Sequence, residues 1–119
     1  MVDGALGYIR VMRGDRTLIP VTKRFDDGRS LDGSETWTFA VRRYKTDATA
    51  LLTLQSPVDI EIDSLSYQPT IIIGAGTLDT TNFPPSEEPV SYWFDLVMTK
   101  DGAPETKQGR FIVVTDVER

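Results

Sequence analysis

Alternation of apolar and polar residues with a period of two is the feature that most constrains the fold of this chain. Trp37, Phe39 and Val41 are separated by threonine and alanine, and Ile60 and Ile62 lie between acidic residues. A period of two sends successive side chains to opposite faces of a β-strand. No stretch of about 11 or more residues keeps the apolar spacing of an amphipathic helix. The sequence therefore predicts an all-β chain with little or no helix.

Short groups of Gly, Pro and Asp, such as Ser56-Pro57 and Asp101-Gly102, separate the alternating runs. Gly and Asp tolerate positive φ, and Pro removes a backbone donor, so these groups end strands. We predict about eight short strands, over residues 7–13, 16–25, 35–45, 49–54, 58–63, 69–74, 90–99 and 107–115. Strands at this spacing are typical of an antiparallel β-sandwich or a small barrel. Segment 75–90 is expected to connect two sheets, with Leu78 and Phe83 turned inward.

The length and composition fit one ordinary globular domain. The chain has 119 residues, of which 39% are hydrophobic and 26% charged. No repeat or linker divides it, so residues 1–119 are expected to form a single domain. No apolar run of about 18 residues occurs, so no membrane span is expected. The N-terminal residues lack the pattern of a secretory signal, which predicts synthesis in a cytoplasm.

Two residue types are missing altogether, and both matter for chemistry. The chain has no histidine and no cysteine. The first absence excludes a Ser-His-Asp triad and His-ligated metal, and the second excludes thiolate nucleophiles, disulfides and thiolate-bound zinc. The net charge of −5 disfavours nucleic acid as a partner, because such binding needs a basic surface. We expect no catalytic residues, no cofactor and no metal.

The last two predicted strands form a hairpin whose core face is the easier one to identify. Leu96 is expected to face Phe111, and Phe94 to face Val113. All four side chains are large and apolar. This shared face is therefore expected to form part of the hydrophobic core.

The other face of the same hairpin is unusually apolar. The same register places Trp93 opposite Val114 and Asp95 opposite Ile112. Trp93, Val97, Ile112 and Val114 then share a face that is too apolar for an ordinary solvated sheet. Either the chain's own residues cover it or another subunit does. We predict that these four residues are anchors of a partner interface.

Asp59, Glu61 and Asp63 form an acidic strip, because they alternate with the apolar residues of one strand. Carboxylates about 7 Å apart along a strand do not converge on one cation, so a metal site is not expected. We predict that the strip is solvated or faces a partner, where it steers charged surfaces together. It also protects an edge strand from unwanted pairing.

Two further charged groups have simpler interpretations. Asp26, Asp27 and Asp32 lie in one glycine-containing segment, and paired carboxylates of this kind occur in glycoside hydrolases. Turn formation explains them better, because a sandwich of this size offers little cleft for a sugar chain. The basic residues of segment 42–45 are interpreted as surface charge.

The order of several motifs carries a family resemblance. These motifs are Arg13-Gly14-Asp15-Arg16-Thr17-Leu18, Asp27-Gly28-Arg29-Ser30-Leu31-Asp32-Gly33, Phe39-Ala40-Val41-Arg42-Arg43, Tyr92-Trp93-Phe94-Asp95-Leu96-Val97-Met98-Thr99-Lys100-Asp101-Gly102 and Gly109-Arg110-Phe111-Ile112-Val113-Val114-Thr115-Asp116-Val117-Glu118-Arg119. In this order the chain resembles small Ig-like β-sandwich proteins of tailed bacteriophages, such as the N-terminal domain of upper-baseplate proteins. The resemblance covers residues 13–43 and 90–119. It departs at 74–88, where Thr80-Thr81-Asn82 and Pro84-Pro85 replace a helical or Ala/Leu-rich turn.

The resemblance implies an Ig-like fold and a structural part of a virion: a tail, baseplate or fibre-attachment module, or a capsid decoration protein. Its partners would be other phage structural proteins, and it would be a homo-oligomer or present in many copies, made in the bacterial cytoplasm and located in the virion. The family has no catalytic residues to carry over. Residues 1–7 are a candidate exchanged arm. The alternative is a carbohydrate- or receptor-binding module at a fibre tip, where Trp93, Tyr44 or Tyr67 would stack on sugar rings.

Overall fold

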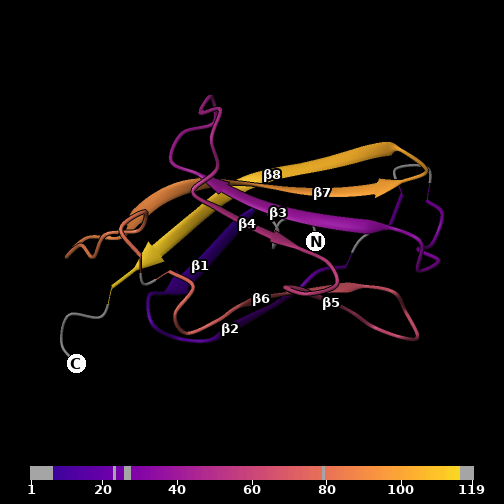
Figure 1. Ribbon diagram of the computed structural model, residues 1–119, viewed down its shortest axis with the longest axis horizontal. Helices are drawn as coiled ribbons and strands as arrows, with labels where there is room; N and C mark the ends of the chain where they lie inside the picture. The colour runs from indigo at the N-terminus through magenta and orange to yellow at the C-terminus, as the bar shows by residue number, and fades with distance from the viewer. Residues whose placement is uncertain (1–6, 23, 26–27, 79, 116–119) are drawn as a thin grey trace.

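The alternating runs form eight β-strands in the computed structural model, which describes residues 7–22, 24–25, 28–78 and 80–115 (Figure 1). The strands are β1 (Tyr8–Met12), β2 (Thr17–Pro20), β3 (Thr36–Arg42), β4 (Leu52–Gln55), β5 (Ile60–Ile62), β6 (Pro69–Ile73), β7 (Val90–Lys100) and β8 (Ala103–Val114). The described residues contain no helix, and so none that could cross a membrane. The predicted all-β class with about eight strands is confirmed.

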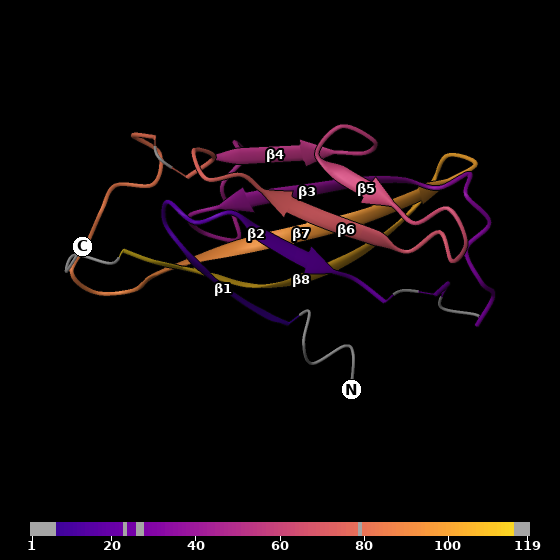
Figure 2. The same ribbon diagram turned by 90° about the horizontal axis from the view of Figure 1, so that it is seen from below.

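The strands form two sheets that pack face to face as a β-sandwich. The larger sheet has five strands in the order β1-β8-β7-β3-β4, and the smaller has three in the order β2-β6-β5. β1 pairs in parallel with β8, while the other pairs are antiparallel. Figure 2 shows the smaller sheet lying across the larger one. The two sheets therefore turn their outer faces in opposite directions.

Large apolar side chains from the facing sides of both sheets fill the space between them. Phe39 of β3 is fully buried, with its ring 5.3 Å from Phe94 and 5.8 Å from Phe111. Ile71 of β6 closes the core from the smaller sheet and is fully buried. Ring pairs at these separations add to the stabilisation from burial alone. The core thus uses one face of each strand and leaves the outer faces for other roles.

The final hairpin has its core face as predicted but a different register. Leu96 pairs with Lys107, and Phe111 pairs with Tyr92, so the predicted pairing is displaced by four residues. The strands continue to a two-residue turn at Asp101-Gly102, where both residues have positive φ (53° and 80°). Such a turn fixes the register of a hairpin. The predicted pairs Leu96–Phe111 and Phe94–Val113 are therefore wrong, although all four side chains are buried.

Several strands are shorter than predicted because turns take over their ends. The strand predicted over 16–25 ends at Pro20, and the one predicted over 58–63 is reduced to β5. Val58 lies in the preceding turn with 82% of its surface exposed. Leu78 and Phe83 are each 1% exposed, which confirms that segment 75–90 is anchored inward.

The predicted exchanged arm falls on residues outside the described part of the chain, apart from its last one. Residues 1–6 are not described. Gly7 lies against the chain's own β8, since its carbonyl oxygen accepts a 3.0 Å hydrogen bond from the Arg110 amide.

Candidate functional site

The register of the larger sheet brings a row of aromatic and basic side chains together on its outer face. Tyr8 of β1 pairs with Arg110 of β8, which pairs with Trp93 of β7, which pairs with Arg42 of β3. Paired residues on neighbouring strands point to the same side of a sheet. Tyr8 is 53% exposed, and Arg110 is also exposed. This row crosses four strands of the molecule's larger face.

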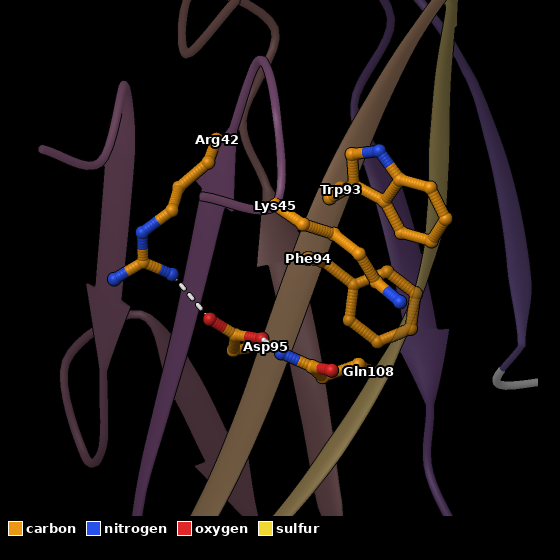
Figure 3. A pocket seen from close by; sticks show the side chains of 6 residues that line it. All are labelled: Arg42, Lys45, Trp93, Phe94, Asp95 and Gln108. Atoms are coloured by element: carbon orange, nitrogen blue, oxygen red, sulfur yellow. Dashed lines mark hydrogen bonds and ion pairs between the residues drawn. The ribbon is translucent and has the colours of Figure 1, made fainter. Parts of the chain in front are cut away.

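Trp93 is the centre of the row and is approached by two cations. The Lys45 ammonium lies 4.5 Å from the centre of its indole ring, and the Arg110 guanidinium carbon lies 4.7 Å from it. Lys45 comes from the segment after β3 and extends toward Trp93 in Figure 3. Cations at these separations are attracted by the ring electrons. The half-buried indole is thus held in place from two elements.

One ion pair lies next to Trp93 and fixes the neighbouring strands. The Arg42 guanidinium is paired with the Asp95 carboxylate, and the Gln108 amide donates a 2.7 Å hydrogen bond to the same carboxylate (Figure 3). These residues, with Lys45, Trp93 and Phe94, border a depression too shallow to hold a water molecule. This part of the surface is therefore suited to contact with a partner and not to holding a separate ligand.

Two more arginines, Arg43 and Arg10, lie near this row, and Arg10 shares its outer face. Arg43 donates a 2.6 Å hydrogen bond to the Ser91 carbonyl oxygen, and Arg110 donates to the Ser91 hydroxyl. Arg10 of β1 is exposed and pairs in register with Ile112. We call the set Arg10, Arg42, Lys45, Trp93 and Arg110 the Trp93 cluster. Arg43 is not part of it, because its guanidinium lies over the ring of the buried Tyr92, on the other side of β7.

Most of the positive charge in the Trp93 cluster is uncompensated. Arg42 has a carboxylate partner, whereas the other three cations, Arg10, Lys45 and Arg110, have none within ion-pair distance among the described residues. The whole chain has 13 basic and 18 acidic residues. A concentration of unpaired cations in an acidic protein creates a local positive potential that attracts anionic surfaces.

The four predicted apolar anchors do not form one apolar patch. The predicted pairs Trp93–Val114 and Asp95–Ile112 are wrong, since Trp93 pairs with Arg110 and Asp95 with Gln108. Val97 is half-buried between two threonines on β3 and β8. Ile112 is only 9% exposed, and Val114 pairs with Met12 of β1. Trp93 is the one of the four that two cations approach, and the interface roles of all four stay predictions.

The acidic strip lies on the opposite sheet, around β5. Glu61 is exposed within the strand, while Asp59 and Asp63 lie in the turns on either side. Hydrogen bonds from the Ser66 amide and hydroxyl and from the Leu65 amide hold the pKa of Asp63 below its usual value. The described residues contain no group of three or more acidic side chains that could hold a metal ion. The strip is therefore a charged surface whose role stays a prediction.

The aspartates of segment 26–32 lie apart from these surfaces. Asp26 and Asp27 lie outside the described residues. Asp32 is paired with the Lys100 ammonium at the end of β7, and this bond, with those from Ser34, holds the pKa of Asp32 well below its usual range. The buried Glu35 carboxylate accepts 3.0 Å bonds from the amides of residues 32 and 33. These contacts order the segment before β3.

The similarity of this chain to known proteins is limited to solved structures, and Tim-2, Tim-1 and CD84 match it with TM-scores below 0.5. No protein-family model matches the chain, and no curated protein matches it by sequence. Among solved structures, Tim-2 matches with a TM-score of 0.49 and 10% identity over 94% of this chain and 95% of that one. Tim-1 matches with a TM-score of 0.41 and 12% identity over 94% and 93%. CD84, described as a SLAM family protein, matches with 0.39 and 10% over 92% and 97%.

Sequence reasoning found part of the Trp93 cluster and missed the rest. It noted the basic residues of segment 42–45 but not Arg10 or Arg110, which lie 100 residues apart in the chain and meet through the parallel β1–β8 pair. The Asp101-Gly102 dipeptide carried a usable signal, because a two-residue Asp-Gly turn places Trp93 opposite Arg110.

Proposed function

We propose that this protein is a non-enzymatic binding module that docks on an acidic protein surface through the Trp93 cluster. The observation that carries the proposal is the approach of two cations without a carboxylate partner, Lys45 and Arg110, to the half-buried ring of Trp93. Interface hot spots are enriched in Trp, Tyr and Arg, and charge complementarity gives such contacts their specificity. The side chains of the cluster supply attraction and contact area, which suit binding rather than bond cleavage.

The position of the cluster supports a docking role. Arg42, Trp93 and Arg110 stand on three neighbouring strands of the larger sheet, so their spacing is set by the backbone pairing. The Arg42–Asp95 ion pair ties the cluster to the centre of that sheet. A surface that is ordered before binding loses less conformational entropy when a partner docks on it.

We further propose that the partner belongs to the virion of a tailed bacteriophage and that the protein is a multi-copy assembly or decoration module there. The resemblance of segments 13–43 and 90–119 to phage Ig-like proteins supports this assignment. The proposed location is the virion, after synthesis in the bacterial cytoplasm. A structural part needs binding surfaces and no catalytic centre, which agrees with the lack of histidine and cysteine.

Purified phage particles provide the test. The protein should co-sediment with particles, and Arg110→Ala should lower its incorporation at least about tenfold, as expected for a central interface residue. Arg16→Ala is the matched control, because it removes one exposed cation beside β2, on the other sheet. Absence of the protein from particles, or equal incorporation of Arg110→Ala and wild type, would refute the proposal.

Carbohydrate binding is the second candidate, and two exposed tyrosines favour it. Tyr44 is 58% exposed and Tyr8 is 53% exposed, both beside the cluster. Trp93 suits sugar stacking less well, because two cations already approach its ring. A glycan-array signal that Tyr44→Ala abolishes and Arg16→Ala leaves unchanged would establish this function. A blank array would refute it.

A further inference from the structure

The outer face of the smaller sheet has chemistry opposite to that of the Trp93 cluster. Leu18 of β2 is 51% exposed and pairs with Ile72 of β6. One row further along, Glu61 of β5 is exposed and pairs with Thr70. The outer face of the smaller sheet therefore has an exposed apolar residue beside carboxylates, whereas the Trp93 cluster has an aromatic residue beside cations. The two surfaces are chemically complementary.

The carboxylates around β5 are uncompensated. Asp59, Glu61 and Asp63 have no cation within ion-pair distance in the part of the chain that the structure describes. The side chains of Asp59 and Asp63 accept hydrogen bonds from neighbouring backbone amides, which are neutral donors and leave the negative charge in place. Arg16, the exposed cation nearest to β2 in sequence, is at the opposite edge of this sheet, across β6.

The positions of the two charged surfaces decide how copies of the chain could meet. The Trp93 cluster and the β5 carboxylates lie on different sheets, whose outer faces point away from each other (Figure 1). A two-fold contact through the cluster would bring unpaired cations of both copies together, which is unfavourable. A contact between the cluster of one copy and the β5 strip of the next brings opposite charges together.

We infer that copies of this protein associate head to tail, with the Trp93 cluster of one copy docked on Leu18, Ile72 and the β5 carboxylates of the next. The contact uses different surfaces on the two copies, so it forms a ring where the rotation closes and an open filament where it does not. This inference rests on the proposed function, since the same cluster makes the contact, and it identifies the acidic partner surface as another copy. Exposed ion pairs are weak and screened by salt, so the association is weak and salt-dependent.

Sedimentation of the purified full chain in buffers of low and high salt tests this arrangement. In about 50 mM salt the average mass of the wild-type protein should rise with concentration, and in about 500 mM salt the association constant should fall at least tenfold. The double variant Trp93→Ala/Arg110→Ala disables the cluster, and Glu61→Lys disables the β5 strip. Each should be monomeric alone. Circular dichroism should confirm that every variant is folded.

Mixing the two disabled variants distinguishes a head-to-tail contact from a symmetric one. Each variant retains one working surface, so an equimolar mixture should form dimers and nothing larger. A wild-type protein that stays monomeric at about 1 mM in low salt would overturn the inference, as would a mixture that remains monomeric. If the wild type is monomeric but Arg110→Ala still blocks incorporation into particles, the inference fails and the proposed function stands.

Discussion

Trp93 and Phe94 are neighbours in sequence on opposite faces of β7, so replacing each with alanine separates the binding surface from the core. Phe94 is 1% exposed and stacks on Phe39 with ring centres 5.3 Å apart. Phe94→Ala should lower the free energy of unfolding by about 3–5 kcal/mol, the range for a buried aromatic ring. Trp93 is half-buried and is held by two cation–π contacts, each worth about 0.5–1 kcal/mol at an exposed site. Trp93→Ala should therefore cost only about 1–2 kcal/mol.

Urea unfolding, followed by far-ultraviolet circular dichroism, measures both losses. With a slope of about 1–3 kcal/mol per molar urea, the midpoint should fall by roughly 1 M for Trp93→Ala and by considerably more for Phe94→Ala. Trp93→Phe keeps a ring beside Lys45 and Arg110, so its midpoint should lie between those of the wild type and Trp93→Ala. A cost of 3 kcal/mol or more for Trp93→Ala would refute the reasoning, because Trp93 would then belong to the core.

Three further outcomes follow from the structure. A methyl group on Gly109 would lie 2.7 Å from both the Gly7 carbonyl oxygen and the Phe94 ring, so Gly109→Ala should cost about 1–3 kcal/mol in a urea titration, and an unchanged midpoint would contradict this packing. The pKa of Asp32 is lowered in the folded state, so its contribution to stability is present above about pH 4 and declines as the pH falls below that value. Asp32→Asn should therefore show a smaller fall in Tm between about pH 6 and pH 3 than the wild type, and parallel curves would contradict the ion pair with Lys100. Acrylamide should quench the wild-type fluorescence mainly at Trp93, since Trp37 is 1% exposed, and strong quenching in Trp93→Phe would contradict the burial of Trp37.

The strands and their core faces could be predicted because alternation reports which side chains face inward. The pairing register of the final hairpin could not be found in the same way. A slip of one residue reverses the faces of a strand, but a slip of four leaves every side chain on the same face. Residues 103–108 have no apolar alternation. The sequence pattern therefore did not predict that β8 begins at Ala103, directly after the Asp101-Gly102 turn, rather than at Lys107.

The binding surface was only partly predictable, because it depends on that register and on non-local pairing. Trp93 was identified as an anchor, but an apolar patch with Val114 was expected in place of a cationic one with Arg110. The contribution of Arg10 depends on the parallel pairing of β1 with β8, which joins the two ends of the chain. Local patterns contain no information on such a pairing. The acidic strip was recognised from sequence, yet its location on the opposite sheet required the fold.

Hydroxyl-radical footprinting of the protein, free and within purified particles, tests most directly whether the Trp93 cluster is the docking surface. Tyr8, Tyr44 and Trp93 should be oxidised in the free protein and protected in the particle, whereas the buried Trp37 should react little in either state. Equal oxidation of Trp93 in both states would contradict the docking surface assigned to the larger sheet.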